Sequence, residues 1–250
     1  MAVLYEYLIK DKAGSTVAYL DKAKNRSFEI VLNKSGSAQF DLSLSDPKAT
    51  GDILQLGNKE LYIYRDKVPV WGGELRYRRA DISETQEKIQ VVAKGFFDML
   101  DKKIAGSPVT PRTFTATDAG DIAWTLIDEA QTGTNADFGI TQGVIATSKD
   151  RDRTFDSFKT VKEIIEHLSS DHIIEGFDFE VDENKQFSVY YPEKGRTLTD
   201  VVFEYGKNLS SFYQTDDGSE MANQVIGEGQ GVGSETLTTT QNSSAMIQET

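Results

Sequence analysis

Residues 61–100 read LYIYRDKVPV WGGELRYRRA DISETQEKIQ VVAKGFFDML, and this stretch decides the fold. Residues 61–64 and 68–71 are mostly β-branched or aromatic and flank a short polar turn, a pattern that predicts a β-hairpin. Gly72 and Gly73 then interrupt the second strand at a point where the missing Cβ atoms allow a bend or a bulge. The segment therefore predicts one long, kinked strand of a curved β-sheet.

The second half of this stretch returns the chain to the same sheet. A polar turn is expected at 83–86 and a further strand at 89–93, and the apolar residues of 95–100 follow at near-helical spacing. Trp71 and Phe97 both lie within these apolar patterns. We therefore expect both side chains in the core of the first domain.

The preceding residues add more strands of the same kind. Residues 4–9 and 17–20 flank a turn-rich segment and predict a hairpin, and residues 28–32 and 40–44 alternate apolar with polar side chains. Six or seven closely spaced strands in about a hundred residues favour a β-barrel or a β-sandwich.

The middle of the chain adds helices. Gly, Ser and Pro at 106–111 mark a boundary, after which Asp118 opens a helix that Gly133 is placed to end. A second helix has Thr160 as N-cap and Glu163 three residues later, the capping-box pattern. Residues 177–191 alternate as another hairpin. The fold class is therefore α+β, mainly β.

Composition narrows the possible functions. The chain has 27 Lys and Arg against 40 Asp and Glu, a net charge of −13, which disfavours nucleic-acid binding. No cysteine is present, which excludes disulfides, thiolate catalysis and Cys-ligated zinc. No apolar run is long enough for a membrane span, and the first residues lack a signal core, so we expect a soluble protein made in the cytoplasm.

No motif indicates catalysis. The run 227–233 has the wrong glycine spacing for a phosphate loop and is expected to be a flexible loop, and His167 and His172 do not form an H-E-x-x-H pair. Serine elbows and calcium loops are also missing from the sequence. Acidic pairs are expected by chance at this composition: Asp128–Glu129, Asp150 with Asp152, and Asp216–Asp217. Because Arg151 and Arg153 interleave with acids, 150–153 is predicted to be a solvated loop. We predict no catalytic, cofactor-binding or metal-binding residues, no cofactor and no enzyme activity.

Several segments occur in an order that resembles a known family. In the first hundred residues these are Val70-Trp71-Gly72-Gly73-Glu74-Leu75, Ile89 to Gly95, and Leu100-Asp101-Lys102-Lys103. In the last part they are Phe187 to Gly195, Phe203 to Asn208, and Ala222 to Gly229. Together they resemble the baseplate hub, or distal tail-tip, proteins of long-tailed bacteriophages over nearly the whole chain.

The resemblance implies a fold and a function. It implies a tail-tube-like β-barrel at 1–105, a helix-containing middle domain at 106–196, and the start of a second tube-like barrel at 197–250. Since 246–250 stops where another strand is expected to start, that second barrel is expected to be incomplete or completed by another chain. The implied role is a homotrimeric structural protein of the virion, closing the tail tube at its tip and adapting six-fold to three-fold symmetry. The implied partners are the distal tail ring protein, the tape-measure protein and tip or receptor-binding proteins, with assembly in the host cytoplasm.

A different class of function remains open from the sequence. A cell-wall carbohydrate-binding or peptidoglycan-degrading module would use aromatic side chains as exposed platforms, and Trp71, Trp124, Tyr190 and Tyr213 are the candidates. Exposure of these four side chains distinguishes the two functions, because platform residues must face solvent and core residues must not.

Overall fold

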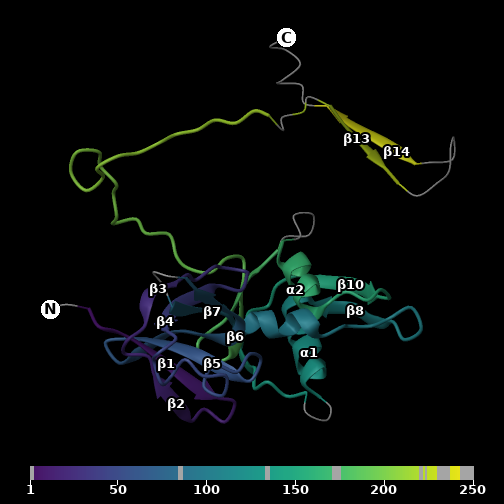
Figure 1. The fold of residues 1–250 in the computed structure, drawn as a ribbon. Helices are drawn as coiled ribbons and strands as arrows, with labels where there is room; N and C mark the ends of the chain where they lie inside the picture. The colour runs from purple at the N-terminus through teal and green to yellow at the C-terminus, as the bar shows by residue number, and fades with distance from the viewer. Residues whose placement is uncertain are drawn as a thin grey trace. The chain divides into compact units, whose positions relative to one another are not determined.

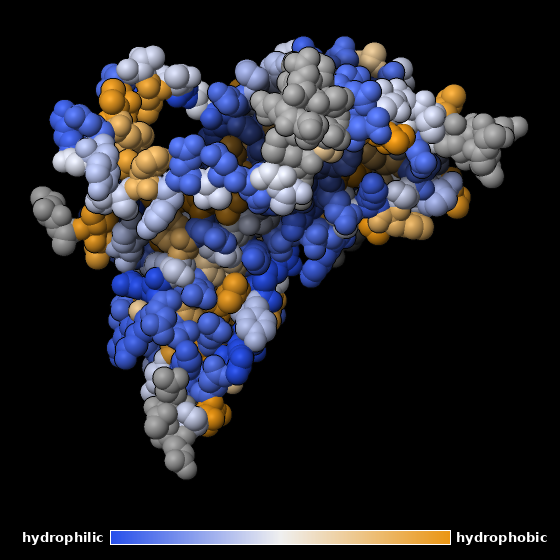
Figure 2. All heavy atoms as spheres, turned by 90° about the horizontal axis from the view of Figure 1, so that it is seen from above, coloured by the Kyte–Doolittle hydropathy of each residue, from blue (hydrophilic) through white to orange (hydrophobic). Residues whose placement is uncertain are grey.

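The computed structural model describes residues 3–83, 87–132, 136–170, 176–219, 222, 224–229 and 237–242. The chain divides into two compact units, Met1–Arg196 and Thr197–Thr250. Several expectations fall outside the described residues: most of the turn at 83–86, the helix end at Gly133, His172, residues 230–233 and the last five residues. Figure 2 shows a surface that is mostly hydrophilic, with hydrophobic residues in small separate groups.

Seven antiparallel strands form one curled sheet in the order β2-β1-β5-β6-β7-β4-β3 (Figure 1). They are β1 (Tyr5–Asp11), β2 (Thr16–Tyr19), β3 (Lys24–Phe28), β4 (Ser37–Ser43), β5 (Lys59–Arg65), β6 (Val68–Ile82) and β7 (Glu87–Gly95). Strands β2 and β3 are the two edges of this sheet and do not pair with each other, so the curled sheet is an open half-barrel and not a closed barrel. The mainly β class and the barrel-like first sheet are confirmed.

The long strand β6 is irregular on both sides of its glycine pair. Its pairing with β5 shifts at Val70, and its pairing with β7 shifts at Arg76. The glycines themselves allow close packing: a Cβ on Gly73 would lie 2.2 Å from the Lys94 carbonyl oxygen, and one on Gly72 would lie 2.6 Å from the Phe96 ring. The predicted kink is thus made by bulges that flank the glycines.

Alternate side chains of these strands fill the inside of the half-barrel. Its core contains Phe40, Leu61, Ile63, Trp71 and Val91, and strands β1 and β2 also contribute buried residues to it. Trp71 is 5% exposed, so its predicted place in this core is confirmed.

The predicted strand at 28–32 is displaced. The strand is β3, which ends at Phe28, whereas Ile30, Val31 and Leu32 are exposed in the loop before β4. The apolar alternation was misleading because these side chains lie in a loop beside the middle lobe.

The middle lobe contains three helices and two small sheets. Its elements are η1 (Phe96–Lys102), β8 (Arg112–Asp118), α1 (Ala119–Gln131), β9 (Thr141–Ile145), β10 (Asp150–Phe155), α2 (Val161–Ser169), β11 (Asp178–Val181) and β12 (Gln186–Tyr190). The sheet β11-β12-β9 has β9 parallel to β12, and β8 pairs with β10. Figure 1 shows this lobe, in teal and green, beside the half-barrel.

Local signals explain where the two α-helices begin. The Asp118 side chain accepts a hydrogen bond from the Gly120 amide, and Thr160 and Glu163 form the predicted capping box. The apolar faces of both helices then pack against the phenylalanine residues of β11 and β12.

Phe97 belongs to this second core, so its expected place in the barrel core was wrong. Its ring lies 4.7 Å from that of Phe179, measured between centroids, and Leu100 of the same 3₁₀-helix joins the same cluster. The short helix η1 therefore lies between the two cores: Phe97 and Leu100 face the middle lobe, whereas the Phe96 ring packs against Tyr62 of the half-barrel, with the two ring centroids 5.7 Å apart. The three-domain division at residues 105 and 196 stays a prediction.

In the unit Thr197–Thr250, the regular structure among the described residues is one antiparallel hairpin, β13 (Gln224–Glu228) with β14 (Thr238–Asn242). Every residue of this hairpin is exposed. The loop expected from Gly227 is wrong for its first two residues, because Gly227 and Glu228 pair with Thr239 and Thr238. Within the described ranges, no helix is long and apolar enough to cross a membrane.

Candidate functional site

The four aromatic candidates do not form a shared platform. Trp71 is in the barrel core, and Trp124 and Tyr190 are half-buried in the middle lobe. Burial and a 2.5 Å hydrogen bond to Glu180 raise the pKa of Tyr190 to about 12. Tyr213 alone of the four is exposed, at 91%.

The ionisable candidates lie apart as well. His167 is exposed on α2, and Glu129 is used in an ion pair with Arg112. Asp152 accepts a hydrogen bond from the Ala116 amide at 2.8 Å. Over the described ranges, no three His, Asp or Glu residues are grouped as metal ligands would be.

The predicted solvated loop at 150–153 is wrong. These residues begin β10, and alternation along the strand turns Arg151 inward, where it is 1% exposed. The mixed-charge pattern concealed a strand because only every second side chain faces solvent.

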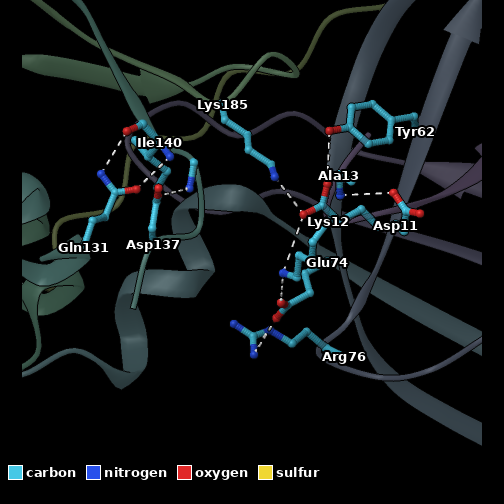
Figure 3. A network of polar contacts seen from close by, with 12 residues as sticks. Asp11, Lys12, Ala13, Tyr62, Glu74, Arg76, Gln131, Asp137, Ile140 and Lys185 are labelled. Carbon is cyan, nitrogen blue, oxygen red and sulfur yellow. Dashed lines mark hydrogen bonds and ion pairs between the residues drawn. The ribbon is translucent and has the colours of Figure 1, made fainter. Parts of the chain in front are cut away.

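The most developed polar arrangement lies where the half-barrel meets the middle lobe (Figure 3). Glu60 of β5 is 0% exposed and accepts a hydrogen bond from Lys185 Nζ, in the turn between β11 and β12, at 2.7 Å. Lys12 Nζ lies 3.5 Å from the same carboxylate, and the Tyr62 hydroxyl donates to it at 3.1 Å. Burial, followed by the charge of Glu60, raises the pKa of Tyr62.

Further ion pairs continue from Lys12 toward α2. Lys12 donates to Glu74 at 2.5 Å, and Glu74 pairs with Arg76 at 2.8 Å. Arg76 Nε lies 3.2 Å from Asp98 of η1, which also pairs with Lys162 of α2 at 3.0 Å. We call these residues, from Glu60 and Lys185 to Asp98 and Lys162, the junction network.

At one end of this network, Asp98 favours the charged form of Lys162. Burial alone would lower the pKa of Lys162, but the hydrogen bond to Asp98 and the charges of Asp98 and Asp101 outweigh it and raise the pKa. The network joins two turns, which carry Lys12 and Lys185, with two barrel strands and two helical elements. Because its acids are paired with cations from both lobes, the network holds the lobes together.

A second link joins the lobes through Asn33, in the loop between β3 and β4. The Asn33 side chain accepts from the Phe179 amide and donates to Asp178, both at 2.7 Å, and its own amide donates to the Phe179 carbonyl at 3.3 Å. The loop thereby covers the edge of β11. The φ angle of Asn33 is 61°, in the left-handed region, which asparagine tolerates better than most residues.

Replacing Asn33 with alanine is expected to lower the free energy of unfolding by about 1–3 kcal/mol. Two side-chain hydrogen bonds are lost, and alanine tolerates the left-handed backbone of this position less well than asparagine does. Asn33→Gly is the matched control, since it relieves the backbone and still loses both bonds. Hydrogen exchange should show lost protection at the Phe179 amide in both variants. Unchanged exchange at Phe179 would contradict the link.

A cavity of about 750 Å³ lies at one end of the half-barrel, lined by β3, β4, the start of β7 and the turns beside them. At its wall, Asp41 accepts hydrogen bonds from Asn25 at 2.7 Å and Lys88 at 2.8 Å. Burial alone would raise the pKa of Asp41, but the bonds from Lys88 and Asn25 outweigh it and lower the pKa.

This pKa shift predicts a pH dependence. A carboxylate whose pKa is lower in the folded state stabilises the fold above its unfolded pKa of about 3.9, and that stability is lost as the pH falls through the folded value. We expect Asp41→Asn to flatten the loss of stability between about pH 5 and pH 2 in denaturant titrations. The control is Asp52→Asn, at an exposed position, and equal pH profiles for Asp41→Asn and wild type would refute the expectation.

Comparisons with known proteins address the fold. No protein-family model matches the sequence, and no curated protein matches it. Among solved structures, the 43 kDa tail protein of prophage MuSo2 from Shewanella oneidensis is 12% identical with a TM-score of 0.59, covering 96% of this chain and 70% of that one. The chain has the fold of prophage tail proteins.

Two further structures bear the same kind of description. Prophage tail protein gp18 from Listeria monocytogenes EGD-e is 13% identical with a TM-score of 0.58, covering 97% of this chain and 69% of that one. A tail protein from Neisseria meningitidis MC58 has a TM-score of 0.48 at 12% identity, and this chain covers 51% of its length. The two prophage tail proteins with TM-scores of 0.59 and 0.58 confirm the resemblance to phage tail proteins at the level of the fold.

Proposed function

We propose that this chain is a structural, non-enzymatic protein of a phage-type tail tip, a baseplate hub that closes the distal end of the tail tube. The observation that carries the proposal is the match of 96–97% of the chain to the fold of two prophage tail proteins. The lobe junction suits such a role, because buried ion pairs and the Asn33 link hold the half-barrel and the middle lobe together.

The proposed assembly is a homotrimer in the virion, formed in the host cytoplasm. Three chains, each with one barrel at 1–105 and the start of a second barrel at 197–250, would present six barrels to the tube and three-fold symmetry to the tip once the second barrels are completed. The exposed hairpin β13–β14 supports a requirement for partners, since an isolated two-stranded hairpin is marginally stable. The proposed partners are the distal tail ring, tape-measure and receptor-binding proteins.

The test is the oligomeric state of the full-length gene product. Mass photometry and class averages should give a three-fold particle that binds the distal tail ring protein. A full-length protein that remains monomeric and does not bind the ring would overturn the assignment.

The same proposal predicts an absence of catalysis. Purified peptidoglycan incubated with the protein should release no more soluble fragments than a heat-denatured sample does. The cell-wall alternative is disfavoured because three of its four platform residues are buried or half-buried. Turnover that disappears in His167→Ala would contradict the prediction.

A further inference from the structure

One open end of the half-barrel combines aromatic and cationic side chains. Tyr5 of β1 pairs with Arg65 of β5, which pairs with Val68 of β6, so the three side chains share one face of the sheet. Leu61 and Ile63, at alternate positions before Arg65, are fully buried, which identifies this face as the inside of the half-barrel. Tyr5, Arg65 and Val68 therefore stand at its rim.

Strand β3 supplies the opposite side of this rim. The rings of Tyr5 and Phe28 are 5.9 Å apart, and Arg26 donates to the Tyr5 carbonyl at 3.2 Å while lying 5.4 Å from the Tyr7 ring. A cavity of about 370 Å³ opens between these residues. We call Tyr5, Arg26, Phe28, Arg65 and Val68 the mouth.

The mouth stays open because β3 cannot extend the sheet there. Its pairing with β4 is irregular between Lys24 and Ser27, and Asn25 has a φ of 48°. A bulge and a lysine on an edge strand both discourage pairing with another strand. A segment bound in the mouth would therefore be held by side-chain contacts and not by backbone pairing with β3.

The segment 197–219, here called the arm, has the complementary composition. All its aromatic side chains are exposed: Phe203, Tyr205, Phe212 and Tyr213. It has four carboxylates, Asp200, Glu204, Asp216 and Asp217, and its one cation, Lys207, is paired with Glu204. Exposed aromatic rings gain most by burial, and free carboxylates gain most beside arginine.

We propose that the mouth of one copy binds the arm of a second copy of this chain. The Phe212 and Tyr213 rings enter the cavity, and Asp216 and Asp217 lie against the two arginines of the mouth. The mouth carries two arginines, and the neighbouring Asp66 carboxylate accepts a hydrogen bond from the Leu4 amide at 3.0 Å, so the arginines favour an acidic occupant. The inference rests on the proposed assembly for the presence of a second copy, and it names the surfaces that meet.

The test uses a fluorescein-labelled peptide of residues 197–219, titrated with the full-length chain and followed by anisotropy. We expect saturable binding that weakens as salt rises from about 0.1 M to about 1 M, because the Debye length falls from about 10 to about 3 Å. Arg65→Glu should weaken binding at least about tenfold, the loss of one close charge pair. Lys102→Glu, at an exposed lysine of η1, is the matched control and should bind as wild type does.

Charge reversal on both sides makes the test specific. A peptide carrying Asp216→Lys and Asp217→Lys should bind wild type poorly and bind the Arg65→Glu chain better than the native peptide does. Arg26→Glu repeats the measurement at a second position, with circular dichroism to verify folding. Because Arg26 contacts Tyr5, the Arg26→Glu variant could unfold. In that case the measurement on Arg65→Glu alone decides the test.

The outcomes separate this inference from the proposed function. Equal binding to wild type and Arg65→Glu would overturn the inference even if the full-length protein is a trimer. A mouth already filled by the arm of its own chain would block the peptide at all concentrations and would also overturn it. Peptide binding with the expected charge dependence supports the contact even where mass photometry gives a monomer, a result that would count against the trimer.

Discussion

Replacing Trp71 with alanine is expected to lower the free energy of unfolding by about 3–5 kcal/mol, the range for truncation of a large buried aromatic side chain. Trp71 is 5% exposed in the barrel core, and its indole N–H donates to the Glu29 carbonyl at 3.1 Å. The substitution leaves a cavity beside Gly73, whose missing Cβ gives the ring its space. Denaturant unfolding followed by circular dichroism measures the effect.

The matched control is Tyr213→Ala, because Tyr213 is an aromatic side chain with 91% exposure. It should change the stability by less than about 0.5 kcal/mol, as surface substitutions usually do. Trp71→Phe keeps most of the apolar contact and loses the hydrogen bond, so its effect should fall between the two. A loss below about 1 kcal/mol for Trp71→Ala would contradict a core role and favour a surface platform.

Replacing Lys185 with methionine is expected to cost about 3–5 kcal/mol, the range for breaking a buried ion pair by removing one partner. The variant keeps the length of the side chain and leaves the fully buried Glu60 carboxylate with Lys12 at 3.5 Å as its remaining cation. Because Lys185 belongs to the middle lobe and Glu60 to the half-barrel, hydrogen exchange should also report loosening at the junction.

A double-mutant cycle separates pairing from packing. Glu60→Met with Lys185→Met removes both charges, and we expect the double variant to recover at least half of the loss seen for Lys185→Met, since apolar replacement of a buried pair is often nearly neutral. Lys207→Met, at an exposed pair with Glu204, is the control and should be nearly silent. Additive losses would show that the two residues act independently.

Much of the architecture could be predicted where local patterns and tertiary packing agree. Alternation in β4 and the β-branched and aromatic content of β5 predicted strands, and the inward side chains of both are buried. The capping box of α2 fixed where that helix begins. The kink in β6 was expected from its glycines and is made by bulges on both sides of them.

The wrong predictions have a common physical cause: a local sequence pattern does not show whether a side chain faces the half-barrel, the middle lobe or solvent. Phe97 has the apolar spacing of a core residue, but its partner Phe179 is far along the chain. Arg151 looked solvated because its neighbours are acidic, and strand alternation buries it. Strands β8, β9 and β10 are polar, so they gave no signal.

The junction could not be predicted for the same reason. Glu60 lies in β5, just before its apolar residues, and Lys185 lies in a turn 125 residues later in the chain. A charged residue next to the buried run 61–63 is the one local signal that could have marked Glu60. It does not identify the partner.

The Asn33 link has a consequence for synthesis. The hydrogen bond between Asn33 and Phe179 joins residues 146 positions apart in the chain. At a synthesis rate of about 5–20 residues per second, Phe179 leaves the ribosome roughly 7–30 seconds after Asn33. All seven strands of the curled sheet precede residue 96, so the half-barrel has its full set of pairing partners long before the second lobe exists. During that interval the side chain and backbone amide of Asn33 lack their partners Asp178 and Phe179 and hydrogen-bond to water, so the link between the lobes forms only after the second lobe is made.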